Sequence, residues 1–120
     1  MIDSLVNMKR VKRQESSGAP GEAMQFAKAD SEAKQLRKQA GGWLKELRAA
    51  AGLSQIQLAQ ILGFKYYTFI SQVENGFGRV PTESMEAWAR ALETDPSAFA
   101  RKLLSYYEPE LYRLLYEVKK

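Results

Sequence analysis

Apolar residues recur at intervals of three and four between residues 43 and 107, the spacing that places them on one face of an α-helix. This pattern predicts helices over about 43–51, 54–62, 66–75, 82–92 and 96–107. Local signals support several of these bounds. Asp95 followed by Pro96 is typical of a helix start, and Gly52 and Gly63 are typical of helix ends. The chain is therefore predicted to be all-α.

The most informative stretch is Leu53–Gly76, LSQIQLAQILGFKYYTFISQVENG. Ser54 and Gln57 are spaced as a capping box, in which each side chain satisfies a free backbone N–H of the other residue. Gly63 would end the first helix, and Glu74-Asn75-Gly76 would close the second. The inward apolar positions are Leu58, Ala59, Leu62, Ile70 and Val73. Two short helices joined by a tight turn that contains glycine predict a helix-turn-helix.

This stretch resembles the Cro/lambda-repressor-type (XRE-like) helix-turn-helix family over roughly residues 42–99. The family motifs present here are Leu53-Ser54-Gln55, Leu58-Ala59, Gly63, Ile70 and Glu74-Asn75-Gly76, followed by Pro81. The spacing from Ala59 to Glu74 is one residue longer than is usual for the family, and the extra residue falls within 64–66. The resemblance implies a compact five-helix, phage-repressor-like domain whose second motif helix, Tyr66–Asn75, lies in the major groove of DNA.

The resemblance also suggests which residues contact DNA. With Ile70 and Val73 turned inward, the predicted base readers are Tyr67, Thr68, Ser71 and Gln72. A glutamine amide can donate and accept together, as adenine N6 and N7 require. The predicted phosphate ligands are Gln55, Lys65, Asn75 and Arg79. Glu74 is expected to be structural because phosphates would repel a carboxylate. Two alternatives stay open. Gln72 could instead be a solvated surface residue, and one of the tyrosines at 66 and 67 could pack on the preceding helix.

Segments on both sides extend this domain, which is predicted to span residues 41–107. Residues 1–21 read as a basic flexible arm that is either a solvated tail or a source of phosphate contacts; its basic residues are Lys9, Arg10, Lys12 and Arg13. Residues 22–40 predict a marginal helix with a thin apolar stripe that includes Phe26, and Gly41-Gly42 is expected to break it.

A sixth helix is predicted within residues 108–120, which the minimal family domain does not need. Its apolar stripe consists of Leu111, Leu114, Leu115 and Val118. This stripe must pack against the fifth helix, against residues 22–40 or against a second subunit. We expect a homodimer contact, because a dimer reads two half-sites where one domain would read only one.

Composition narrows the function. The chain has 120 residues, a net charge of +4, no cysteine and no histidine. No disulfide, thiolate or zinc finger is therefore possible, and no metal or cofactor is expected. Residues 1–40 contain eight Lys/Arg and five Asp/Glu, and residues 41–80 contain four Lys/Arg and two Asp/Glu. Residues 81–120 contain six Lys/Arg and seven Asp/Glu. A basic first part fits a nucleic-acid face. Gly76-Phe77-Gly78 lacks the context of a dinucleotide site, so no enzyme is expected.

These observations favour a sequence-specific, double-stranded DNA-binding transcriptional regulator, a repressor from a bacterium or its mobile elements. Gln55, Gln72 and Arg79 all face outward in this interpretation, with no acidic residue among them. No small-molecule effector is expected because few residues follow the fifth helix. With no membrane-length apolar run and no signal peptide, the cytoplasm with its nucleoid is the expected location. Two alternatives remain: the antitoxin of a toxin–antitoxin pair, and a protein-interaction module that keeps the fold without binding DNA.

Overall fold

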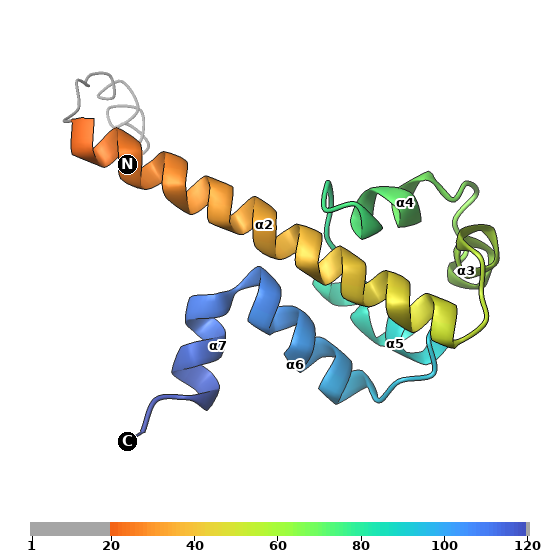
Figure 1. Cartoon of the computed structure of the whole chain (residues 1–120). Coiled ribbons are helices and arrows are strands. Elements are labelled where there is room, and N and C mark those ends of the chain that lie inside the picture. The colour runs from red at the N-terminus through yellow and green to blue at the C-terminus, as the bar shows by residue number, and fades with distance from the viewer. Residues whose placement is uncertain (1–19, 120) are drawn as a thin grey trace, which may run out of the picture. The chain divides into compact units, whose positions relative to one another are not determined.

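The computed structural model describes residues 20–119, with side chains from residue 28 onward. Its elements are α2 (Pro20–Ala50), α3 (Gln55–Leu62), α4 (Thr68–Glu74), the short 3₁₀-helix η1 (Thr82–Ser84), α5 (Met85–Ala91), α6 (Pro96–Tyr107) and α7 (Pro109–Tyr116) (Figure 1). Within this range every element is helical, which confirms the predicted all-α class. The predicted basic arm, with Lys9, Arg10, Lys12 and Arg13, lies outside the described residues, as does the side chain of Phe26.

The expected break at Gly41-Gly42 is wrong. A single helix, α2, passes through both glycines and ends at Ala50. The reason lies in its packing rather than in its local sequence. Gly41 is buried against the backbone of Val73 and Glu74 at the end of α4, where a side chain would not fit. The glycine permits two helix backbones to approach closely, and the surrounding residues of α2 keep the helix intact.

The predicted capping signals are confirmed. The Ser54 hydroxyl accepts from the Gln57 N–H at 3.0 Å, and the Gln57 amide oxygen accepts from the Ser54 N–H at 2.8 Å. Gly63 ends α3 with φ of 82°, in the left-handed region that favours glycine. Asp95 accepts from the Ala98 N–H at 2.9 Å, with Pro96 at the first position of α6. These local bonds fix where α3 and α6 begin.

The core lies in the compact unit that starts at residue 33. Trp88 on α5 and Phe99 on α6 are its largest fully buried side chains. Trp43 of α2 stacks beside Phe99, with ring centroids 5.5 Å apart. The remaining buried apolar residues are Ala40, Leu44, Leu58, Ala59, Ile70, Val73, Val80, Ala89, Leu92 and Leu103. All five predicted helices of the domain contribute to this core, which holds α3 and α4 against the rest of the unit.

The sixth predicted helix is present as α7, directly after α6 (Figure 1). None of its residues is buried, and its apolar stripe stays largely open. No helix among the described residues has the length and apolar content to cross a membrane.

Candidate nucleic-acid interface

A buried ion pair fixes the end of α4 to α2. Arg48 donates from Nε to Glu74 Oε2 at 2.6 Å and from Nη2 to Glu74 Oε1 at 3.0 Å. The side chains of Glu74 and Arg48 are only 1% and 12% exposed. These hydrogen bonds raise the pKa of Arg48 above its ordinary value. The arginine also donates from Nη1 to the Leu53 carbonyl at 2.9 Å, which ties in the loop before α3. Glu74 was expected to be structural because phosphates would repel its carboxylate. These contacts give it that role.

Gln55 joins the same network at the start of α3. Its Nε2 donates to Glu74 Oε1 at 3.0 Å, so one carboxylate connects α2, α3 and α4. A glutamine amide carries two N–H donors and one acceptor. The second donor and the amide oxygen of Gln55 are not used in this bond. The side chain is therefore held in one position at the edge of the interface with hydrogen-bonding capacity left.

The helix α4 is shorter than predicted. It starts at Thr68 rather than Tyr66, and Tyr67 and Asn75 occupy its two cap positions. Residues 64–67 form the turn before it, and the Tyr67 side chain makes no hydrogen bond that caps the helix. Tyr67 lines a hollow together with Ile56 and Gln60 of α3, and its side chain is 48% exposed. It thus lies on the α3 side of the turn.

Of the other predicted readers, Thr68 and Gln72 lie on the exposed face of α4 and Ser71 does not. Thr68 and Gln72 line a second shallow hollow together with Lys65 and Tyr66. Ser71 is half-buried, and its hydroxyl accepts from Asn75 Nδ2 at 3.4 Å. Thr68 and Gln72 therefore share one outward surface with a cation, whereas Ser71 faces partly inward.

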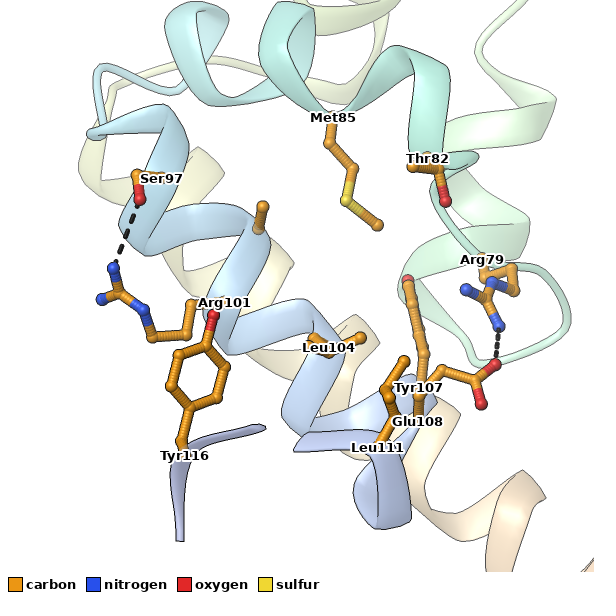
Figure 2. A pocket seen from close by; sticks show the side chains of 11 residues that line it. Arg79, Thr82, Met85, Ser97, Arg101, Leu104, Tyr107, Glu108, Leu111 and Tyr116 are labelled. Carbon is orange, nitrogen blue, oxygen red and sulfur yellow. Dashed lines mark hydrogen bonds and ion pairs between the residues drawn. The ribbon is translucent and has the colours of Figure 1, made fainter. Parts of the chain in front are cut away.

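The loop after α4 is anchored from α6. The Val80 N–H donates to the Tyr107 hydroxyl at 3.1 Å, and the Arg79 guanidinium lies over the Tyr107 ring, 4.3 Å from its centroid. Arg79 also donates to Glu108 Oε2 at 3.5 Å (Figure 2). Burial raises the pKa of Tyr107, an effect that the Val80 N–H and nearby arginines oppose. Arg79 is thus exposed but held in place by two residues that sequence reasoning did not single out.

Sequence reasoning also missed two further residues near this loop, Lys38 and Phe77. Gly76, with φ of 84°, packs on α2 so tightly that a Cβ there would lie 2.8 Å from the Cα of Lys38. Lys38 itself is exposed, which adds a cation beside the loop. Phe77 is 84% exposed between Gly76 and Gly78. The cluster of basic residues at 34–38 was the available signal for Lys38, whereas nothing in the sequence marked Phe77.

Two short helices held by a buried ion pair, with the second presenting polar side chains beside cations, define a DNA-binding helix-turn-helix domain. A helix-turn-helix family model matches residues 44–99. This domain belongs to the Cro/lambda-repressor-type (XRE-like) helix-turn-helix family, whose members are DNA-binding regulators and typically not enzymes. No curated protein matches the chain.

Proposed function

We propose that the chain is a transcriptional repressor that binds a specific double-stranded DNA operator as a homodimer. The observation that carries the proposal is the position of Thr68 and Gln72, which share one exposed surface of α4 with Lys65. Side chains that donate and accept hydrogen bonds read base edges, and a neighbouring cation serves a phosphate. The Arg48–Glu74 pair supports this role because it fixes the direction of α4.

The phosphate contacts proposed around α4 come from three sides. Gln55 approaches from the start of α3, Lys65 from the turn, and Asn75 and Arg79 from the far end of α4. Such contacts set the register of a protein on the duplex without reading sequence. Tyr67 and Ser71 have smaller proposed roles in base reading, because Tyr67 lies toward α3 and Ser71 is half-buried.

The decisive experiment is selection of bound sequences from random double-stranded DNA, followed by binding curves for Gln72→Ala. We expect one enriched sequence, on which Gln72→Ala costs roughly 1–3 kcal/mol per half-site and relaxes preference at one base pair. The loss of affinity for random DNA should be small. Gln35→Ala is the matched control, since Gln35 is an exposed glutamine of α2. Absence of any enriched sequence would contradict the proposal, and a reporter gene behind the enriched sequence would test repression.

The homodimer is supported by the open stripe on α7. Its apolar residues Leu111, Leu114 and Leu115 are between 45% and 59% exposed, and Val118, which follows the end of the helix, is 47% exposed. Exposed apolar surface gathered on one helix face favours a protein contact. Sedimentation of the wild-type chain should show a dimer, and the double variant Leu111→Glu, Leu115→Glu should be monomeric and bind the operator more weakly. A wild-type monomer at tens of micromolar, both free and on DNA, would contradict this part of the proposal.

A further inference from the structure

A groove of about 490 Å³ lies between η1, α5, α6 and α7 (Figure 2). We call it the α6–α7 groove. Its apolar lining comes from Met85, Ala100, Leu104, Leu111 and the ring of Tyr107. Clefts that hold small organic ligands are typically about 300–1,000 Å³ and mostly apolar, with a few placed polar groups. The α6–α7 groove has that size and that lining.

The charges of the groove are distributed unequally between its two ends. At one end, Arg79 is paired with the carboxylate of Glu108 at 3.5 Å. At the other end, Figure 2 shows Arg101, whose guanidinium donates to the Ser97 hydroxyl at 3.2 Å. Within the part of the chain that the structure describes, Arg101 forms no ion pair. The groove therefore combines an apolar surface with one arginine whose charge is not neutralised.

This combination selects the chemistry of a ligand. A neutral apolar molecule would cover the lining but leave Arg101 without a counter-charge. A dianion would bring its second charge to the end where Arg79 is already paired with Glu108, so this second charge would find no free cation. A single carboxylate on an apolar body satisfies both features, because arginine binds a carboxylate through two parallel hydrogen bonds and apolar burial adds affinity.

We propose that the α6–α7 groove binds an amphipathic monocarboxylate of about the size of a medium-chain fatty acid. The carboxylate pairs with Arg101, and the apolar body lies along Leu104 and Met85 toward Leu111. This site differs from the expectation of no small-molecule effector. It goes beyond the proposed DNA reading and does not depend on it.

The test uses sodium decanoate as the probe and isothermal titration calorimetry of the full chain without DNA. We expect saturable binding of one decanoate per chain, with the neutral analogue decanol at least about tenfold weaker. Arg101→Gln should weaken decanoate about tenfold and leave decanol almost unchanged. Arg90→Gln is the matched control, because Arg90 is an exposed arginine of α5 that pairs with Glu86 outside the groove. Leu104→Gln should weaken both ligands.

Three results would overturn the proposal. The first is non-saturable binding, and the second is equal weakening by Arg101→Gln and Arg90→Gln, which would reveal a general charge effect. The third concerns a second copy of the chain as the occupant. If the wild-type dimer binds no decanoate but a monomeric Leu115→Glu variant does, the groove is filled by the partner subunit. Because no DNA is present, none of these results bears on whether α4 reads an operator.

Discussion

Gly41 faces the main-chain carbonyl of Glu74 so closely that a Cβ at residue 41 would lie 2.2 Å from the carbonyl oxygen. The neighbouring Gly42 points to open space, with nothing within 4 Å of a Cβ placed there. Two adjacent glycines of one helix therefore have opposite roles. Gly41 permits the crossing of α2 and α4, whereas Gly42 contributes no contact.

We expect opposite effects on stability from the same substitution at these two positions. Gly41→Ala should lower the free energy of unfolding by about 3 kcal/mol, because the methyl group meets backbone that cannot move aside easily. Gly42→Ala should raise it by about 0.5–1 kcal/mol, since alanine favours a helix interior. Urea unfolding of both variants is the measurement. Equal stabilisation by the two alanines would mean that α2 does not cross α4 at Gly41.

The same glycines show what the sequence can and cannot predict. Ser54, Gln57, Gly63 and Asp95 act through bonds to backbone within a few residues, so their helix ends follow from local chemistry. A glycine pair inside a helical pattern is ambiguous, because it permits either a break or a close crossing. Only the contact with Glu74, more than thirty residues away, decides between them. The continuous course of α2 therefore could not be derived from its own residues.

In the candidate interface, too, some features could be predicted from the sequence and others could not. The helical period places Thr68 and Gln72 outward, and the repulsion between a carboxylate and phosphates identifies Glu74 as structural. The start of α4 could not be fixed because the extra residue near Lys65 can be taken up by either the turn or the helix. The support of Arg79 by Tyr107 joins residues far apart in the chain, and no periodic pattern records it.

Substituting only one partner of the buried Arg48–Glu74 pair should greatly lower the free energy of unfolding. Glu74→Gln leaves the Arg48 charge largely buried and uncompensated, so we expect a loss of about 3 kcal/mol in the free energy of unfolding. The double variant Arg48→Met, Glu74→Leu should recover part of that loss, because it leaves no buried charge. Urea denaturation of the single and double variants measures both. A loss below about 1 kcal/mol for Glu74→Gln would show that the pair is not buried as described.

Tyr107 should make stability depend on alkaline pH. Its pKa is raised by burial above the ordinary value of 10.0, so the unfolded chain releases this proton first. The contribution of the protonated Tyr107 to the free energy of unfolding is fully present below about pH 10, and it is lost as pH rises through the higher pKa of the folded state. We expect Tyr107→Phe to be less stable at neutral pH, because Val80 loses its acceptor, and to show a shallower decline above pH 10. Chemical unfolding at about pH 8, 10 and 11 tests this. Parallel declines for the two proteins would exclude Tyr107 as the cause.

The last prediction concerns Arg79 and the carboxylate beside it. Glu108 accepts from Arg79 at 3.5 Å, an exposed pair that contributes little to stability but competes with a phosphate for the same guanidinium. Arg79→Ala should weaken binding to operator and random DNA about equally and reduce the salt slope by about 0.9 for each phosphate that the arginine would have neutralised. Glu108→Gln should do the reverse and strengthen binding to both DNAs, because the arginine is released and a repelling charge is removed.

A double-mutant cycle distinguishes this competition from a general change in net charge. If Glu108 acts through Arg79, its substitution should gain much less affinity in the Arg79→Ala background than in the wild type. Glu86→Gln is the matched control, since Glu86 is an exposed glutamate that pairs with Arg90 rather than with the loop. Binding curves at two salt concentrations give affinity and slope together. The contrary result would be that Glu108→Gln and Glu86→Gln raise DNA affinity equally, and by the same amount in the Arg79→Ala background. Glu108 would then affect DNA binding only through the overall charge of the protein, and Arg79 would not be a phosphate ligand for which Glu108 competes.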